Sequence, residues 1–413
     1  IALPKLVDAL ESKNYEPDIP GVYFLRDNEM CGTGMGELIE LDSMPFQDKS
    51  DVFRDYPYMQ RLYVVNSQRS CQFSCTFCGS PKYRDAYYEV DETIFRRRSV
   101  DNLIRELYNA KKTIPKMQTV GFFDDTFTSG KQWIRDFAKE YKKYIGFPYF
   151  MCTNPCLLQD EDLVYQLKES GLTYVEIGVQ AIDEAFRIEK VKRPDSDKHI
   201  FKTAKMLRKH EIYFQANHIF GLDLKDFHDE KFLKETMNYY MELDPNRTHC
   251  FELEFLPGCE ETDRALNDNR ISQEQYDNIH QGDSSASYNF GGSLDEIEGM
   301  KNKNKVFTPY IVLLEMMPFL PYSLIQKALD NKLVFKLVRM IPHNYIILAR
   351  LMNTLKDSRD IEGSPHYRKY WDGALRVISI KKHLRLLRSR KSNSNDDHNV
   401  FPPSGLIASD SYS

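Results

Sequence analysis

The chain has 413 residues, of which 41% are hydrophobic and 28% are charged, and its formal net charge is -5 at pH 7. These values are typical of a soluble globular protein with two or three domains, and they give no reason to expect nucleic acid as a partner. Eight cysteines are too sparse over this length for a disulfide scaffold. We therefore expect free thiols in a reducing compartment, the cytoplasm.

The first sixty residues lack a regular pattern. We expect a short amphipathic helix at Leu3–Leu10, followed by an irregular connector that Pro20, Gly21 and Pro45 interrupt. The sequence does not begin with Met, and the leucines of this helix have no obvious surface to pack on. We interpret 1–60 as a connector left from a preceding domain, and the chain as a portion of a longer protein.

Residues 61–290 follow a strand-then-helix rhythm. The apolar runs predicted as strands are Leu62–Val65, Thr119–Phe123, Tyr149–Cys152, Tyr174–Val179, Tyr213–Phe220 and Cys250–Phe255. Helices are predicted between them, one opening at the capping residue Ser99 and others over Lys131–Tyr144 and Asp160–Ser170. Such alternation predicts parallel βαβ units. Six units in about two hundred residues indicate an incomplete TIM-like (β/α)6 barrel, with its chemistry at the carboxyl ends of the strands.

Two of these strands predict a polar barrel interior, because side chains alternate between the two faces of a strand. In the fourth strand we place these residues toward the helices: Val175, Ile177 and Val179. The interior then receives Glu176, Gly178 and Gln180. In the sixth strand we place Phe251, Leu253 and Phe255 outward, and Glu252 and Glu254 inward. Buried carboxylates require a polar occupant of the interior.

The composition changes after about residue 290. Residues 291–391 are rich in apolar residues at helical spacing, which predicts a mainly helical region. Its apolar runs are too short to span a membrane, yet the basic segment 381–391 leaves peripheral membrane contact open as an alternative to a packed subdomain. The polar residues 392–413 are predicted to be a disordered tail.

Three cysteines directly follow the first predicted strand of the barrel. Cys71, Cys75 and Cys78 have the spacing C-x3-C-x2-C. Three thiolates this close can hold three corners of a cubane iron–sulfur cluster, and the absence of a fourth nearby cysteine leaves one iron open to a small molecule. A structural zinc site is the alternative, although zinc usually completes its tetrahedron with a fourth Cys or His at short spacing.

With Phe77 between the second and third cysteines, this motif resembles that of the radical S-adenosylmethionine (radical SAM) enzymes. The resemblance implies a [4Fe-4S] cluster whose open iron binds the amino and carboxylate groups of SAM. An electron from the cluster then cleaves SAM to a 5′-deoxyadenosyl radical. It also implies a six-stranded partial barrel, adenine seated near Phe77, and a reductant such as flavodoxin or ferredoxin.

Further positions match weaker motifs of the same family. The sequence Asp124-Asp125-Thr-Phe-Thr resembles the D-D-x-F-T version of cobalamin-type members, in which a carboxylate meets the amino group of SAM. The resemblance does not choose between Asp124 and Asp125, and an Asx cap on the next helix is the alternative. Gln180 matches the element that reaches the SAM ribose, and Glu176 shares its strand face.

The fifth strand matches the family element against which adenine lies. Ile219 and Gly221 fall in this element, and Asn217 shares the interior face with Ile219. Arg193 follows the fourth strand, where relatives can place a cation toward the SAM carboxylate; a surface arginine is the alternative. An auxiliary cluster is a further alternative for the remaining cysteines of the barrel, which are Cys152, Cys156, Cys250 and Cys259.

The connector 1–60 resembles the segment that joins a cobalamin-binding domain to the barrel in cobalamin-dependent radical SAM proteins. The D-x-H-x-x-G motif of that domain is absent from this sequence, so we expect almost all of the domain to lie outside the chain. The resemblance implies methyl transfer to an unreactive carbon of a small-molecule or lipid-like substrate. A non-methylating radical reaction (cyclisation or rearrangement) and a non-catalytic iron–sulfur protein are the alternatives.

Overall fold

A computed structural model describes residues 2–27, 29–36, 38–88, 95–282, 304–338, 340 and 345–361. All elements discussed below belong to one compact unit, residues 1–367. The predicted boundary near 290, the basic segment 381–391 and the tail 392–413 lie outside the described residues. The predicted domain limits therefore stay predictions.

The centre of the fold is a six-stranded sheet in which every described pairing is parallel. Its strands are β3 (Leu62–Val65), β6 (Thr119–Phe122), β7 (Tyr149–Thr153), β8 (Leu172–Gln180), β9 (Tyr213–Phe220) and β10 (Arg247–Glu252). They lie in the order β10-β9-β8-β7-β6-β3, so β3 and β10 are the edges of an unclosed sheet. The predicted α/β fold with six parallel strands is confirmed.

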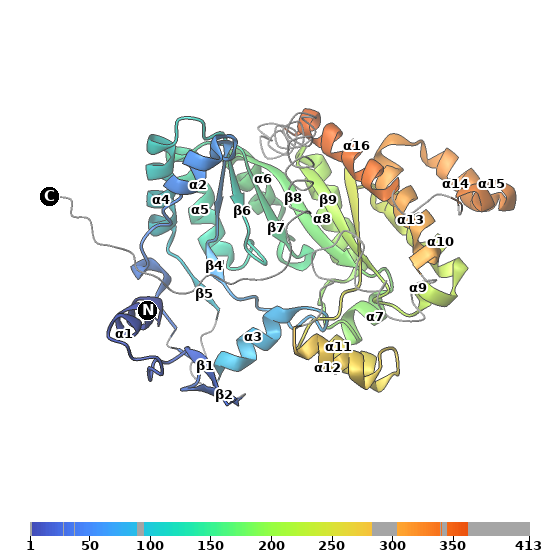
Figure 1. The fold of residues 1–413 in the computed structure, drawn as a ribbon. Helices are drawn as coiled ribbons and strands as arrows, with labels where there is room; N and C mark the ends of the chain where they lie inside the picture. The colour runs from blue at the N-terminus through green and yellow to red at the C-terminus, as the bar shows by residue number, and fades with distance from the viewer. Residues whose placement is uncertain are drawn as a thin grey trace, which may run out of the picture. The chain divides into compact units, whose positions relative to one another are not determined.

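Helices follow the strands and cover the outer face of the sheet (Figure 1). Those between strands are α3 (Gly79–Tyr88), α4 (Val100–Thr113), α5 (Lys131–Tyr144), α6 (Glu161–Ser170), α7 (Glu184–Glu189), α8 (Asp197–Lys209), α9 (Lys225–His228) and α10 (Glu230–Leu243). Ser99 caps α4 as predicted, since its side chain accepts from the Asn102 N–H. Gly171 ends α6 in the left-handed region, with φ 117°.

The remaining elements flank the sheet. Residues 2–61 contribute α1 (Ala2–Glu11), β1 (Tyr23–Arg26), β2 (Glu29–Gly32), α2 (Ser50–Asp55) and a 3-10 turn at Pro57–Arg61. A two-stranded ribbon pairs β4 (Gln68–Arg69) with β5 (Arg96–Arg97). After β10 come α11 (Glu260–Asn267), α12 (Gln273–His280), α13 (Asn304–Met316), α14 (Tyr322–Asp330), α15 (Lys332–Val338) and α16 (Tyr345–Asp360). Among the described residues, no helix combines the length and apolarity that a membrane span requires.

The predicted alternation holds in β8 and fails in β10. Val175, Ile177 and Val179 are fully buried in the core between sheet and helices, as predicted. In β10, however, Phe251 pairs with Ile219 of the interior face and Glu252 pairs with Phe220 of the outer face. The predicted outward Phe251 and inward Glu252 are therefore wrong. Leu253 and Phe255 do pack in the outer core, because the chain leaves the ladder after Glu252 and no longer alternates regularly.

The amino end of the barrel is closed by side chains and by the end of α16. A small apolar cluster fills it, made of Leu62, Phe150, Tyr174, Tyr213 and Ile361. Beside this cluster the buried carboxylate of Asp357 on α16 accepts from Arg247 at 2.8 Å and from the Tyr213 hydroxyl. Figure 1 shows α16 at one end of the sheet, and α3, α11 and α12 together at the other. The second end carries the cysteine loop.

Candidate functional site

The cysteine loop lies between β4 and α3, at the carboxyl end of the first barrel strand. Its backbone is held from outside: Thr76 N–H donates to Val191 O at 3.1 Å, and Glu261 N–H donates to Thr76 O at 2.9 Å. From α3, Arg84 donates to the carbonyls of Cys71 and Phe73, each at 3.3 Å. These contacts fix the loop against three separate parts of the barrel, which sequence spacing alone could not show.

The three cysteines are free thiols with different surroundings. Cys75 is buried, whereas Cys71 and Cys78 are partly exposed. Burial raises the pKa of Cys75 to about 11, and the Arg193 guanidinium opposes this rise. In the described part of the chain, no three His, Cys, Asp or Glu side chains converge on a single metal ion. A cubane binds each thiolate through a different iron, so its ligands need not converge on one point.

The two neighbouring aspartates after β6 have different roles. Asp124 is buried, and its carboxylate accepts from Ser67 N–H and Ser67 Oγ, both at 2.8 Å, and from Gln68 N–H at 2.9 Å. It fixes the backbone that leads from β3 into the cysteine loop. Burial raises the pKa of Asp124, and these hydrogen bonds oppose the rise. Because both of its oxygens are occupied, Asp124 is a structural residue.

Asp125 is exposed and lies beside the third cysteine. Its carboxylate accepts from Ser80 Oγ at 3.0 Å, and Ser80 N–H lies 3.4 Å from Cys78 Sγ. Burial raises the pKa of Cys71, and the nearby charge of Asp125 adds to it. A cavity of about 360 Å³ is lined by Asp125 together with Tyr83 and Phe123. Asp124 also lines this cavity, but it is buried and both of its oxygens accept hydrogen bonds, whereas Asp125 is exposed there.

The end of β8 departs from regular strand geometry. Gln180 has φ +68°, and the register with β9 shifts between Gly178 and Gln180. A Cβ on Gly178 would lie 2.4 Å from Gln180 Nε2 and 3.1 Å from Arg193 Nη2, so a larger residue there would require both side chains to move. Within the described residues, Gln180 Oε1 is buried without a hydrogen-bond partner. A buried amide oxygen of this kind fits a ligand that supplies a donor, such as a ribose hydroxyl.

Arg193 is a buried residue, and the interpretation as a surface arginine is wrong. It is 5% exposed. Its Nη2 donates to Asp195 at 2.9 Å, to Gly178 O at 3.0 Å and to Asn154 Oδ1 at 3.1 Å. Its Nη1 lies 3.9 Å from Cys75 Sγ. The guanidinium therefore joins the cysteine loop to the end of β8.

A polar network crosses the interior face from β8 to β9. The Tyr174 hydroxyl lies 2.9 Å from Gln215 Oε1 and 3.1 Å from Glu176 Oε1. Gln215 Nε2 donates to Asn217 Oδ1 at 2.7 Å. The structure thus brings together Glu176 and Asn217, which the sequence analysis singled out, and adds Tyr174 and Gln215, which it did not. The only sequence signal for Tyr174 was its position two residues before Glu176, which places it on the same face of the strand.

The end of β9 bends at Gly221, which has φ +83°. Its N–H donates to Asp226 Oδ2 at 2.8 Å, and Asp226 is buried. Burial raises the pKa of this carboxyl well above its usual value, although the Gly221 hydrogen bond opposes it. Ile219 is half-buried and, like Phe77, packs against the main core. The sequence offered no sign that Asp226 would hold this bend.

The other cysteines of the barrel do not gather. Cys152 lies on the end of β7, whereas Cys250 is fully buried in the outer core beside Glu315. Cys259 lines a cavity of about 480 Å³ together with Cys75 and Cys78. These thiols thus lie on different elements: at the end of β7, in the outer core, and beside the cysteine loop. Cys259 is instead a neighbour of the cysteine loop.

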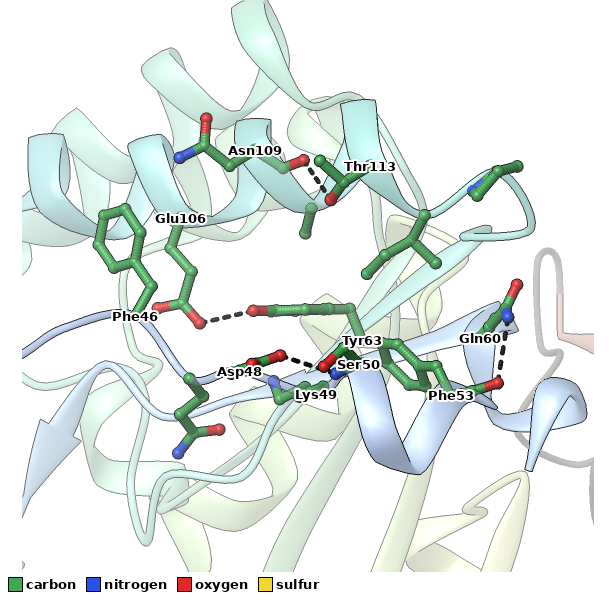
Figure 2. A pocket seen from close by; sticks show the side chains of 14 residues that line it. Phe46, Asp48, Lys49, Ser50, Phe53, Gln60, Tyr63, Glu106, Asn109 and Thr113 are labelled. Carbon is green, nitrogen blue, oxygen red and sulfur yellow. Dashed lines mark hydrogen bonds between the residues drawn. The ribbon is translucent and has the colours of Figure 1, made fainter. Parts of the chain in front are cut away.

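Another cavity, of about 400 Å³, lies away from this site between the connector, β3 and α4 (Figure 2). Lys49 and Phe53 line it from the connector side, and Glu106 lines it from α4. The Tyr63 hydroxyl lies 2.7 Å from Glu106 Oε1, and the Lys49 amine lies 3.5 Å from the centre of the Tyr63 ring. These contacts join the connector to the barrel and have no link to the cysteines.

The residues present at the carboxyl end fit a cubane cluster and SAM. Cys71, Cys75 and Cys78 supply three free thiols on one anchored loop. Beside them are an available carboxylate on Asp125 and a buried, unpartnered amide oxygen on Gln180. A cofactor with an ammonium group and hydroxyl groups would satisfy both.

Comparison with known proteins gives matches that agree with this arrangement. Residues 65–235 match the family described as "Radical SAM superfamily". Two curated relatives are anaerobic magnesium-protoporphyrin IX monomethyl ester cyclases. That of Rubrivivax gelatinosus is 25% identical over 173 residues, covering 40% of this chain and 29% of the relative. That of Cereibacter sphaeroides is 22% identical over 246 residues, covering 54% and 36%. The chain thus spans about a third of the relatives' length.

Solved structures show the same fold at low identity. The cobalamin-dependent S-adenosylmethionine radical enzyme OxsB, with aqua-cobalamin and S-adenosylmethionine bound, gives a TM-score of 0.53 at 13% identity, covering 93% of this chain and 64% of that one. The radical S-adenosylmethionine methyltransferase TsrM of Kitasatospora setae, with tryptophan and aza-SAM bound, gives 0.51 at 14% identity, covering 65% and 52%. At such identities the likeness concerns the fold alone.

Proposed function

The chain belongs to the radical SAM enzyme family, and from this premise we propose that it cleaves SAM at a cluster held by Cys71, Cys75 and Cys78. The observation that carries the proposal is the position of these free thiols on one anchored loop at the carboxyl ends of the strands, beside Asp125. The cluster, when bound, supplies the electron that breaks a carbon–sulfur bond of SAM and so generates the radical.

The chain's own residues bind and orient SAM. Asp125 accepts hydrogen bonds from its ammonium group, because Asp124 is fully engaged by Ser67 and Gln68. Gln180 Oε1 accepts from a ribose hydroxyl and so gains the partner that it lacks. Phe77 and the backbone from Ile219 to Gly221 seat the adenine, with Gly221 allowing close approach.

The interior face is proposed to hold the polar parts of the substrate. Glu176 and Asn217 belong to one hydrogen-bonded network there, and Glu254 carries a buried oxygen without a partner in the described residues. These groups favour a substrate that presents hydrogen-bond donors. We propose a small-molecule or lipid-like substrate, and a flavodoxin or ferredoxin as the electron donor.

For the reaction that follows radical formation, we propose cobalamin-dependent methyl transfer to an unreactive carbon. The fold shared with OxsB and TsrM supports this proposal. A cyclisation without methyl transfer is the second candidate, favoured by the two curated relatives, which are cyclases.

Anaerobic reconstitution with iron and sulfide, followed by reduction with dithionite and addition of SAM, tests the first step. We expect 5′-deoxyadenosine, measured by liquid chromatography, and none from the variant in which all three cysteines are Ala. A reconstituted, reduced protein that leaves SAM intact would refute the proposal. Incubation with SAM that carries a labelled methyl group, followed by mass spectrometry of candidate substrates, then separates the two candidate reactions: label in the product supports methyl transfer, and a cyclised product without label supports cyclisation.

A further inference from the structure

The guanidinium of Arg193 is held in one position behind the cysteine loop. Three hydrogen bonds of its Nη2 have acceptors on three different segments, namely Asp195, Gly178 and Asn154. A charge this deeply buried is stable only when it is paired and hydrogen-bonded. With Nη2 anchored in this way, Nη1 is directed at Cys75 Sγ, at 3.9 Å. The contact with the sulfur thus follows from the surrounding geometry.

The partner of Arg193 is itself fixed. Asp195 is fully buried; its Oδ2 accepts from Arg193, and its Oδ1 accepts from Cys156 N–H at 2.7 Å. The backbone carbonyl of Asp195 accepts from Arg187 Nε at 2.7 Å. Arg187, also fully buried, donates to Ala181 O and to Asp197 and makes no described contact with a cysteine. Two buried arginines therefore share one frame, and only Arg193 contacts a thiol.

We propose that Arg193 is a positioning residue that raises the reduction potential of the cluster through the thiolate of Cys75. This inference rests on the proposed function, in which Cys75 is a ligand. Reduction transfers one electron from an external donor to the cluster and adds one negative charge to it. A buried N–H and positive charge beside a ligand sulfur stabilise the reduced form more than the oxidised form. The same guanidinium, through Gly178, ties this ligand to the end of β8.

Asp195 should shift the reduction potential of the cluster in the opposite direction, lowering it. Its negative charge lies 2.9 Å from Arg193 Nη2 and offsets part of the positive charge that Cys75 experiences. Neutralising Asp195 leaves the cation at the sulfur uncompensated, which favours reduction. A residue pair that only stabilised the fold would not shift the potential in opposite directions.

The experiment is a redox titration of the reconstituted protein, with dithionite as reductant and the reduced cluster followed by electron paramagnetic resonance, in the absence of SAM. In Arg193→Gln we expect the equilibrium constant for reduction to fall about tenfold, which is about 59 mV for a one-electron couple. In Asp195→Asn we expect a rise. The matched control Arg187→Gln removes the charge of another buried arginine of the same frame and should shift the potential far less.

Iron content and circular dichroism show whether each variant is folded and loaded. If Arg193→Gln does not assemble a cluster, the double variant Arg193→Gln/Asp195→Asn, which removes both buried charges, is titrated in its place. Its reduction potential should still lie below that of Asp195→Asn. Equal shifts in Arg193→Gln and Arg187→Gln, or no shift in a loaded Arg193 variant, overturn the inference. An unchanged potential with weakened SAM binding would show that Arg193 acts on SAM instead. Failure of the proposed function is distinct, because then the unsubstituted protein would not cleave SAM.

Discussion

The two ends of the barrel differ in how their buried polar groups are hydrogen-bonded. At the amino end, the Asp357 carboxylate is enclosed by Arg247, Tyr213 and α16, and a small apolar cluster fills the remaining space. At the carboxyl end, Gln180 Oε1 and Asn154 Nδ2 are buried without partners in the described residues, and Gln180 has a left-handed backbone. The first end is complete by itself and stabilises the fold. The second end keeps buried polar atoms that a bound ligand would satisfy, so substitutions at the two ends should have separable effects.

The largest expected effect is at the carboxyl end. Replacing Cys71, Cys75 or Cys78 by Ala should reduce the iron content of the reconstituted protein from about four per chain to almost none, because a cubane is poorly retained on two thiolates. Iron analysis and electron paramagnetic resonance measure this. The control replaces Cys152, Cys156 and Cys259 together and should keep the cluster. Loss of iron in the control, with retention in the Cys75 variant, would show that the cluster lies elsewhere.

At the amino end, Arg247→Met should lower the free energy of unfolding by about 3–5 kcal/mol, since it removes the guanidinium that pairs with the buried Asp357 carboxylate. Urea denaturation of the cluster-free protein measures it. Lys142→Met breaks an exposed pair with Glu169 and should cost less than about 1 kcal/mol. The loaded Arg247 variant should bind SAM normally below its unfolding transition. Weakened SAM binding there would mean that the two ends are coupled.

Within the carboxyl end, substitutions of the two aspartates should have different effects. Asp125→Asn should weaken SAM binding by about 1–3 kcal/mol while the fold is kept, as should Gln180→Ala, because each removes one hydrogen-bonding partner of the ligand. Asp124→Asn should instead lower stability, because it weakens the bonds to Ser67 and Gln68. Titration of SAM against the reduced cluster gives the affinities. Unchanged affinity in both the Asp125 and Gln180 variants would exclude this placement of SAM.

The smallest expected effect concerns Lys49, which lies at neither end of the barrel. Burial lowers the pKa of Lys49 to about 8, although Glu106 opposes this. Between pH 8 and the usual lysine pKa of about 10.4, the unfolded chain binds more protons than the folded one, so Lys49 makes stability rise with pH. The difference in urea midpoint between the unsubstituted protein and Lys49→Met should therefore change across this window. A constant difference would contradict the lowered pKa.

Much of the fold could be predicted from the sequence, because strand and helix periodicity is local. Each of the six strands was placed, and the helix cap Ser99 was found from residues a few positions apart. The predicted faces of Phe251 and Glu252 in β10 were wrong. This strand is only six residues long and the chain leaves the ladder after Glu252, which breaks the alternation on which the prediction depended. The closure of the amino end was not predicted, because it joins Tyr213 to Asp357, 144 positions away.

The candidate site likewise combines local features that the sequence could predict with long-range contacts that it could not. The spacing of Cys71, Cys75 and Cys78 is local and could be recognised directly. The choice between Asp124 and Asp125 could not be made, because it depends on Ser67, which lies 57 positions away. The contact between Arg193 and Cys75 spans 118 positions and was likewise inaccessible. The sequence pattern therefore identifies the proposed ligands, while the contacts that surround them require the folded chain.

The unclosed edge of the sheet at β3 has a consequence for solubility. The carbonyls of Arg61 and Val65 face β6 and accept from Gln118 and Phe123, so the Val64 carbonyl faces the open side. There it accepts from the amine of Lys49, a connector residue that Figure 2 shows close to Tyr63 of β3. A bare edge strand recruits strands from other molecules, and a lysine laid along it is a common protection. The connector thus guards the barrel against edge-to-edge aggregation.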